Sequence, residues 1–187
     1  AIAAVDAAIL SDVQADLNAA QVLVSALNAG ATKTAEQSRI NTQQGVIDQN
    51  IVDAASALVD AAVLSDLLAD WEDANDAVVA LPAGADKTAL LSALAAQVPF
   101  TLVKEAELSD EQGDLNAASA SVASMAASVN KLALQDRVVA QQLVVDGIAT
   151  AAVVAAEAAD TQASLDAALE LVNALNASAS RTALVTR

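Results

Sequence analysis

The chain has 187 residues, of which 56% are hydrophobic and only 1% aromatic, and it contains neither cysteine nor histidine. These absences exclude disulfides, thiolate chemistry, zinc sites of the usual nitrogen and sulfur type, and histidine acid–base catalysis. The formal net charge of −16 argues against partners that carry phosphate, so we predict binding neither to nucleic acid nor to anionic lipid.

Four sequence blocks that align without gaps indicate an internal repeat. The blocks open with SDVQADLNAA, SDLLADWEDA, SDEQGDLNAA and ADTQASLDAA, at residues 11, 65, 109 and 159, and successive blocks start 54, 44 and 50 residues apart. A period of this size is typical of stacked helical units. The sequence therefore predicts four helical repeats, at residues 1–52, 53–105, 106–148 and 149–187, of which the last is incomplete.

Each block is expected to begin as an amphipathic helix. Apolar residues recur at spacings of three and four, which places them on one helical face and leaves Asp, Asn and Gln in water. In the first block these residues are Leu10, Val13, Leu17, Ala20, Val24 and Leu27, and in the second Leu64, Leu67, Trp71, Ala74, Val78 and Leu81. Because Trp71 stands where other blocks have leucine, we expect it in the core and not as a ligand-stacking platform.

A short turn is predicted next in each block, with the sequences LNAGATKT, LPAGADKT, MAASVNKL and LNASASRT. Gly30 and Gly84, with Pro82, are expected to end the preceding helix, because glycine tolerates left-handed geometry and proline cannot continue the hydrogen-bond ladder. The next helix is expected to start at a column of N-cap side chains, Thr32, Asp86, Asn130 and Ser180. The segment is then the turn of an αα-hairpin.

Two columns of basic residues follow the predicted caps. The first column is Lys33, Lys87, Lys131 and Arg181, and the second is Arg39, Arg137 and Arg187, with Ala93 breaking it. A cation in the first turn opposes the helix macrodipole, so we predict that the first column forms ion pairs with Asp or Glu on the facing helix. Recognition of an acidic cell-wall polymer is the alternative, and no sequence feature supports it.

Further breaks are expected near residues 45–50, 98–101 and 147–149, at Gly45, Pro99 and Gly147. The longest charge-free run, residues 115–130, is too short to span a bilayer, so no membrane insertion is predicted. The serines that open three blocks are further N-caps or ordinary surface residues: Ser11, Ser65 and Ser109. The predicted fold class is all-α, with tandem antiparallel helical hairpins, long helix then short, forming an elongated helical bundle or solenoid.

The turn motif, most complete in DANDAVVALPAGADKTALLSAL, resembles that of alanine-rich tandem helical repeats of Bacillus and Paenibacillus surface proteins, S-layer-associated and cell-wall-bound chains among them. The resemblance covers all four blocks and implies an extracellular location and a stalk or spacer role, with no catalytic residues. This chain departs from the pattern by lacking the turn proline in three blocks. Its last block also stops at Arg187, which aligns with Arg39.

No catalytic, cofactor-binding or metal-binding residues are predicted. Neighbouring acids such as Asp70 with Asp73, or Asp110 with Glu111, are interpreted as a solvated acidic face, because glycosidase sites need a cleft and aromatic sugar platforms. A calcium loop of the DxDxDG kind is absent from the sequence.

We therefore expect a non-enzymatic structural or spacer module of a surface protein, whose partners are protein surfaces such as neighbouring repeats or copies of itself. One alternative is a self-assembling subunit, joined head to tail through incomplete terminal repeats into a filament or layer. Another is a surface-active or ice-binding alanine-rich bundle. That role would need a regular threonine or alanine ladder on an exposed face, whereas the threonines cluster at the turns.

Overall fold

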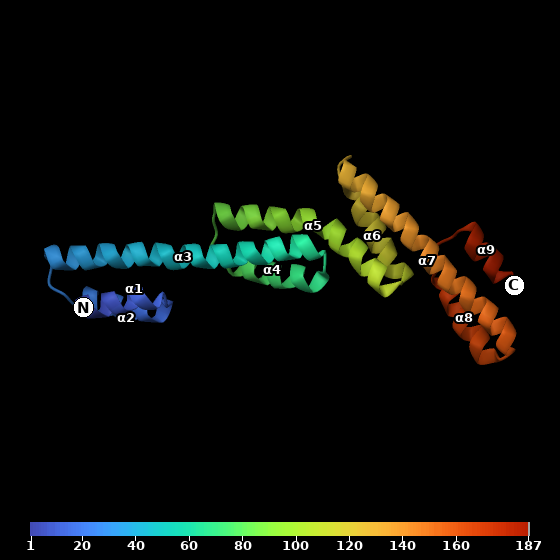
Figure 1. Ribbon diagram of the computed structural model, residues 1–187, viewed down its shortest axis with the longest axis horizontal. Helices are drawn as coiled ribbons and strands as arrows, with labels where there is room; N and C mark the ends of the chain where they lie inside the picture. Colours follow the sequence, from blue (N-terminus) through green and yellow to red (C-terminus); the bar gives the residue numbers. More distant parts are fainter. Residues whose placement is uncertain (187) are drawn as a thin grey trace. The chain divides into compact units, whose positions relative to one another are not determined.

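A computed structural model gives the structure of residues 1–186, and every regular element in them is an α-helix (Figure 1). The predicted all-α class is confirmed, as the high helix propensity of alanine and leucine favours. The predicted order of a long helix then a short one is wrong in the first three repeats, where α2, α4 and α6 have 12 or 13 residues and the helices that follow them have 25 to 35. In chain order the helices are α1 (Ile2–Ser11), α2 (Gln14–Ser25), α3 (Ala31–Ser65), α4 (Leu68–Ala80), α5 (Ala85–Ser109), α6 (Gln112–Ser124), α7 (Val129–Ala159), α8 (Gln162–Ala174) and α9 (Ala179–Val185).

Two kinds of connection alternate along the chain. Between α1 and α2, α3 and α4, α5 and α6, and α7 and α8 the chain reverses through a corner of two residues, beginning at Asp12, Asp66, Asp110 and Asp160. The other connections are turns of four or five residues that precede α3, α5, α7 and α9. Gln14 bonds Gln44 and Gln21 bonds Gln37. Residues later in α2 thus contact residues earlier in α3, as in an antiparallel pair.

The three long helices run through every position where a break was predicted. Gly45 lies within the 35 residues of α3, Pro99 within α5 and Gly147 within α7, so those predictions are wrong. Glycine costs only about 1 kcal/mol relative to alanine in a helix, and Pro99 is buried, so packing offsets its missing N–H. The predicted repeat boundaries after residues 52, 105 and 148 also fall inside these helices.

Replacing Gly45 with alanine is expected to stabilise the protein by about 0.5–1 kcal/mol, because the glycine is helical and an added Cβ would meet no atom within 4 Å. The measurement is urea denaturation followed by circular dichroism. Gly30→Ala is the matched control and should be destabilising by about 0.5 kcal/mol, because glycine is the better residue immediately before a helix. A destabilising Gly45→Ala would mean that α3 does bend there.

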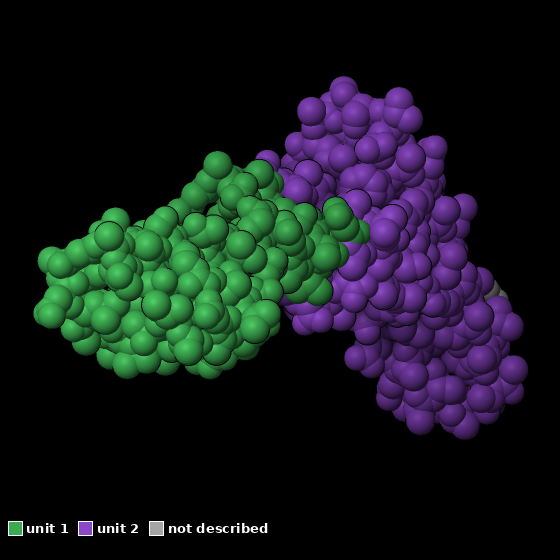
Figure 2. Space-filling view, turned by 60° about the vertical axis from the view of Figure 1, so that its left-hand side comes forward, with its two compact units in different colours: residues 1–60, 74–91 green, residues 61–73, 92–187 purple. Residues whose placement is uncertain are grey.

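The chain divides into two compact units, coloured separately in Figure 2. Unit 1 comprises residues 1–60 and 74–91. Its core is built from small and branched aliphatic side chains, which let helix backbones approach closely. One cluster joins α1, α2 and α3 and consists of Val5, Ala8, Leu17, Ala20, Val24, Ile40 and Ile47.

Unit 2 comprises residues 61–73 and 92–187, of which those up to 186 are described. Its main cluster draws on α5, α6, α7, α8 and the end of α9. The buried members are Val103, Ala106, Leu115, Ala118, Val122, Leu134, Val145, Ala149, Val172, Leu175 and Leu184. The buried side chains of α7 thus pack toward both α6 and α8, so one helix stabilises both pairs.

The predicted apolar stripe is only partly buried. Leu17 is 1% exposed and belongs to the core, whereas Leu10 is 88% exposed and its aligned residue Leu64 is 87% exposed. The stripe fails there because Leu10 and Leu64 lie on the helices before the corners, α1 and α3, whereas most of each predicted stripe lies on the helix after the corner. Trp71 is half-buried and its Nε1 donates to the Leu94 carbonyl at 3.0 Å, which supports a packing role.

Helix α7 is, among the described residues, the one that is long and apolar enough to cross a membrane by length and composition. The core helix of a helical bundle passes the same test. Helix α7 contacts α6, α8 and α9 and carries the buried, hydrogen-bonded Gln141, and 22% of its most apolar window is buried.

Candidate functional site

The corners carry the most regular feature of the molecule. Each begins with an aspartate in the left-handed conformation, Asp12, Asp66, Asp110 and Asp160, with φ between 48° and 57°. These are the non-glycine residues of positive φ in the described chain, and aspartate tolerates this conformation better than most residues. A residue with extended backbone follows, as at Val13, Glu111 and Thr161. The serine before three of the corners accepts a hydrogen bond from the amide two residues on, so it is not an N-cap.

A buried glutamine donates to the aspartate at three of the four corners. Gln43 bonds Asp12, Gln97 bonds Asp66, and the Gln141 Nε2 bonds the Asp110 carboxylate at 2.7 Å. The three glutamines are 6–7% exposed, so each bond satisfies an amide that would otherwise be costly to bury. For Asp160, the aligned position lies 31 residues on, beyond Arg187.

Our sequence analysis missed these glutamines, although a signal was present. The aligned blocks extend without a gap from the arginine column to Gln43, Gln97 and Gln141, each 31 residues after its aspartate. Helix breaks were expected near Gly45, Pro99 and Gly147, so the glutamines before them were not predicted to lie inside long helices that face the corners.

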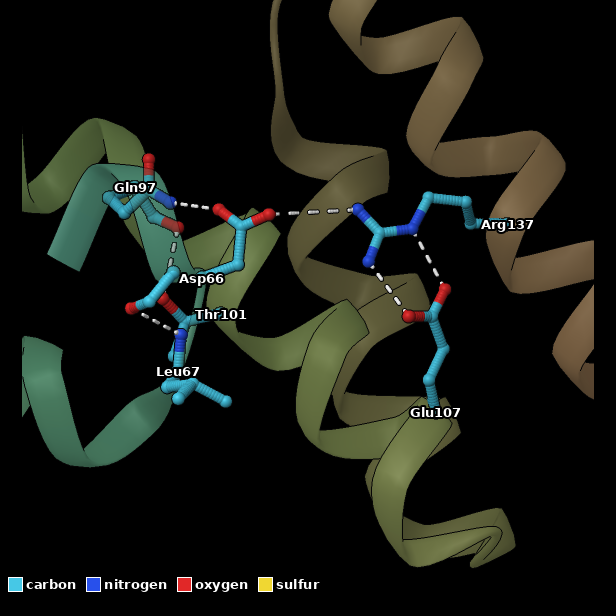
Figure 3. Close-up of polar contacts among 7 residues, drawn as sticks. Asp66, Leu67, Gln97, Thr101, Glu107 and Arg137 are labelled. Atoms are coloured by element: carbon cyan, nitrogen blue, oxygen red, sulfur yellow. Dashed lines mark hydrogen bonds and ion pairs between the residues drawn. The ribbon is translucent and has the colours of Figure 1, made fainter. Parts of the chain in front are cut away.

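A second polar cluster surrounds Asp66 in unit 2 (Figure 3). Arg137 on α7 forms a two-point ion pair with Glu107 on α5, with both N···O distances 2.8 Å, and lies 4.0 Å from the Asp66 carboxylate. The hydrogen bonds that Arg137 donates to the Glu107 carboxylate lower the pKa of Glu107 and raise the pKa of Arg137. In unit 1, Arg39 similarly binds Asp6 and Glu36. Arg187, the third member of this basic column, lies outside the described residues.

Replacing Glu107 with glutamine is expected to destabilise the protein by about 0.5–1 kcal/mol at neutral pH, because the charged pair is partly shielded from water. The folded-state pKa of Glu107 is lowered, so its contribution is fully present above the unfolded pKa. It is lost as the pH falls through the folded pKa.

The free-energy difference between wild type and Glu107→Gln should therefore shrink as the pH falls from about 6 to about 3. Urea denaturation at several pH values measures it. Glu105→Gln is the matched control, because Glu105 makes no hydrogen bond or ion pair in the described structure. A difference that stays constant with pH would contradict the role given to the Glu107 charge.

The predicted N-cap residues lie two residues too late in the sequence. Thr32, Asp86, Asn130 and Ser180 are each the second residue of their helix, α3, α5, α7 and α9. The residues before the helices are Gly30, Gly84, Ser128 and Ser178, and the two serine hydroxyls accept from the amides of Lys131 and Arg181. Gly30 and Gly84 have no positive φ, so they precede the next helix and do not end the last one in left-handed geometry.

The predicted ion pairs of the first basic column are also wrong for its lysines. The Nζ of Lys33 donates to the carbonyls of Ser25 and Leu27, at 2.7 and 3.0 Å. Lys87 and Lys131 repeat the contact at the ends of α4 and α6. Each ammonium thus satisfies carbonyls that the preceding helix leaves without partners, at the negative end of its macrodipole. That attraction offsets the repulsion at the start of the lysine's own helix.

Arg181 departs from this arrangement. Its Nε is buried and has no hydrogen-bond partner among the described residues. The planar guanidinium carries its donors in a fixed fork, which does not reproduce the lysine contact.

Replacing Lys87 with methionine is expected to destabilise the protein by about 1 kcal/mol, because two carbonyls at the end of α4 lose a charged donor while the aliphatic stem remains. Thermal and urea denaturation measure the change. The matched control is Lys104→Met, which removes the one cation outside the two columns and should change stability by less than about 0.5 kcal/mol. Equal losses would show that net charge, and not the carbonyl contact, is responsible.

An open groove lies between the second half of α7, α8 and the end of α9, all within unit 2. We call it the α7–α8 groove; its volume is about 430 Å³. Residues lining it include Val153, Ala156, Asp160, Leu165, Leu169 and Leu184. Its lining is mainly apolar and includes the left-handed Asp160.

The polar groups of the molecule mostly bind one another or the backbone. Within residues 1–186, no group of three or more acidic side chains is placed to hold a metal ion. Three of the corner carboxylates accept amide donors, and the three lysines of the first basic column bind carbonyls, so the arrangement connects helices to each other. Comparison of the chain with family models, curated proteins and solved structures gave no match.

Proposed function

We propose that this chain is a non-enzymatic structural or spacer module of an extracellular surface protein. The observation that carries the proposal is the recurrence of the same two contacts at aligned positions, the aspartate–glutamine bond at the corners and the lysine–carbonyl bond at the turns. A protein selected for a single site needs such contacts once. A protein whose useful property is its array of helices needs them in each repeat.

The long helices support a mechanical role. At a rise of about 1.5 Å per residue, the 35 residues of α3 extend for about 50 Å without a flexible linker. Successive repeats therefore share a helix instead of a loop. We infer that a pulling force would pass along hydrogen-bonded backbone, which suits a spacer that holds other domains away from a surface.

An ice-binding role receives less support from the threonines. The hydroxyls of Thr34, Thr88 and Thr182 donate to the carbonyl four residues earlier, at the start of their helices. Side chains engaged in this way do not form the repeated outward-facing ladder that an ice surface would require.

Self-association remains the second candidate function, and the observation that favours it is the exposure of large apolar side chains such as Leu10 and Leu64, at 88% and 87%. Light scattering on a size-exclusion column over a wide concentration range separates the two candidates. A spacer module should stay monomeric at every concentration. Polymers or fibres, seen also by negative-stain electron microscopy, would overturn the spacer proposal in favour of a self-assembling subunit.

Removing one repeat gives a second test. Deletion of residues 66–109 joins Ser65 to Asp110 and keeps the corner sequence, because Asp110 aligns with Asp66. A spacer should tolerate this change, so the variant should remain helical and monomeric, and small-angle X-ray scattering should show a shorter particle. Loss of folding in the shortened chain would contradict the modular construction on which the proposal rests.

The extracellular location is tested separately. Protease added to intact cells that express the protein should cleave the chain at the turns, since loops are cut more readily than packed helices. Complete protection, with cleavage only after lysis, would contradict the surface location.

A further inference from the structure

Each of the first three corners is preceded by an exposed leucine. Leu10, Leu64 and Leu108 lie two residues before their corner aspartates and are 88%, 87% and 60% exposed. A single exposed leucine is common on protein surfaces. Three of them in one column of the aligned blocks indicate a shared property of the corners.

The leucines have the helical phase of the helix that follows the corner. Leu10 lies seven residues before Leu17, and Leu108 lies seven before Leu115, and seven residues are close to two helical turns. In an uninterrupted helix each pair would therefore share a face. In α1, however, Leu10 follows the buried Ala8 by two residues and so lies on the opposite side. The pattern fits a single helix through residues 2–25, which we call the joined helix, as well as the observed pair α1 and α2.

Helix α3 has an exposed apolar residue where the joined helix would need one. Gln14 on α2 bonds Gln44 on α3, and α3 continues well past that point. Because α2 and α3 are antiparallel, a helix that extended α2 backward would place Leu10 near Ile51. Ile51 is 50% exposed, so the joined helix would remove apolar surface of both residues from water.

The left-handed aspartate is the residue that interrupts the joined helix. Asp12 has φ 53° and ψ 25°, and Val13 after it is extended. Aspartate tolerates the left-handed region better than alanine does, and it favours helix less. Gln43 on α3 also donates to the Asp12 carboxylate. The backbone and the hydrogen bond therefore both favour the corner over the joined helix.

A second copy of the chain fits the space that α1 would leave on straightening. Val5 and Ala8 on α1 are both 0% exposed and pack with Leu17 in the cluster of unit 1, and Asp6 binds Arg39 on α3. A straightened α1 would lose these contacts and expose its apolar face. In a pair of chains, each α1 can restore the same contacts on the other chain, which is domain exchange.

We infer that Asp12 keeps the chain monomeric, because it prevents the joined helix through which two copies would exchange α1. The same reasoning extends to Asp66 and Asp110, whose preceding leucines are exposed as well. The role of Asp12 does not rest on the spacer function. Assembly of the wild type would contradict the spacer proposal, whereas the role of Asp12 is decided by the difference between two of its variants.

Asp12→Ala and Asp12→Gly separate the backbone conformation from the hydrogen bond. Both remove the carboxylate that Gln43 binds, but glycine adopts the left-handed conformation freely, whereas alanine favours helix. After refolding from urea at high protein concentration, light scattering on a size-exclusion column should show a dimer for Asp12→Ala and a monomer for Asp12→Gly. A monomeric Asp12→Ala, or equal dimer formation by both variants, would overturn the inference.

Distances between spin labels show whether the dimer contains the joined helix. The chain has no cysteine, so Ala3→Cys and Val22→Cys place two labels at exposed positions. The two positions are 19 residues apart, which is about 30 Å along one helix but about 10 Å between the axes of adjacent helices. Doubly labelled Asp12→Ala, refolded with excess unlabelled Asp12→Ala, should give the long distance by electron paramagnetic resonance, and Asp12→Gly the short one. Dimers of Asp12→Ala with the short distance would refute the exchange of α1.

Adding Leu10→Asp to Asp12→Ala tests the part played by the exposed leucine. The dissociation constant of the dimer should rise about tenfold or more, because a charge would then lie on the apolar face of the joined helix. Leu64→Asp in the same background is the matched control, since it adds the same charge at an equally exposed leucine outside α1 and α2, and it should leave the dissociation constant unchanged. Equal effects of the two substitutions would contradict the inference, because net charge and not the joined helix would then control the dimer.

Discussion

Replacing Leu17 with alanine is expected to destabilise the protein by about 3 kcal/mol. Leu17 is 1% exposed and lies in the cluster that joins α1, α2 and α3. Its neighbours there are valines, isoleucines and alanines, whose short side chains cannot move far enough to fill the space that the leucine leaves. The loss therefore combines the transfer free energy of the missing atoms with the cost of a cavity. Urea denaturation followed by circular dichroism measures it.

Leu10→Ala is the matched control, because Leu10 belongs to the same predicted stripe seven residues earlier and is 88% exposed. Its replacement should change stability by less than about 0.5 kcal/mol. Similar losses for Leu10→Ala and Leu17→Ala would show that α1 continues in the helical phase of α2, so that the left-handed corner at Asp12 does not exist.

Replacing Asp110 with alanine is expected to destabilise the protein by about 2–3 kcal/mol, from two separate causes. Alanine lacks the short polar side chain that makes the left-handed conformation tolerable, which costs about 1 kcal/mol. The buried Gln141 also loses a charged acceptor, which costs about 1–2 kcal/mol. Gln141 keeps its bond to the Ala106 carbonyl at 3.0 Å, so its amide retains one partner.

Two further variants separate these causes. Asp160→Ala changes an aspartate with the same backbone conformation but without a glutamine partner in the described residues, so only the backbone cost of about 1 kcal/mol is expected. Asp110→Asn keeps both the backbone tolerance and an oxygen acceptor, and should lose less than about 1 kcal/mol. Equal losses for Asp110→Ala and Asp160→Ala would contradict a stabilising role for the Gln141 bond.

The helical class and the spacing of the repeat could be predicted because both depend on local pattern. Alanine and leucine favour helix wherever they occur, and the aligned blocks begin at the four corners that the structure forms. The turns before α3, α5, α7 and α9 were also placed within a few residues. Their chemistry was misassigned, because Thr32 and Asp86 are good N-cap residues by type, yet Gly30 and Gly84 occupy the position.

The continuity of the long helices could not be predicted from local signals. Gly45 and Pro99 are helix-breaking residues in isolation, and only packing on neighbouring helices keeps α3 and α5 unbroken around them. The lysine contacts illustrate the same limit. A cation in a first turn requires a compensating negative charge, but the sequence does not indicate that carbonyls of the preceding helix supply it.

The sequence by itself determined that the chain is helical, that its blocks repeat and, to within a few residues, where the turns before α3, α5, α7 and α9 lie, because propensity and periodicity act over a few residues. It did not indicate the two-residue corners, since the predicted apolar stripe ran straight through them. The tertiary structure alone decided which leucines are buried, which donors face the corner aspartates, and that the α7–α8 groove is open. These properties depend on contacts between residues about 30 positions apart, and a local pattern holds no information about which partner occupies the facing position. Leu17 and Leu165 have the same side chain at the same place in the repeat, and only the helix that covers one of them makes the first a core residue and the second part of an open groove.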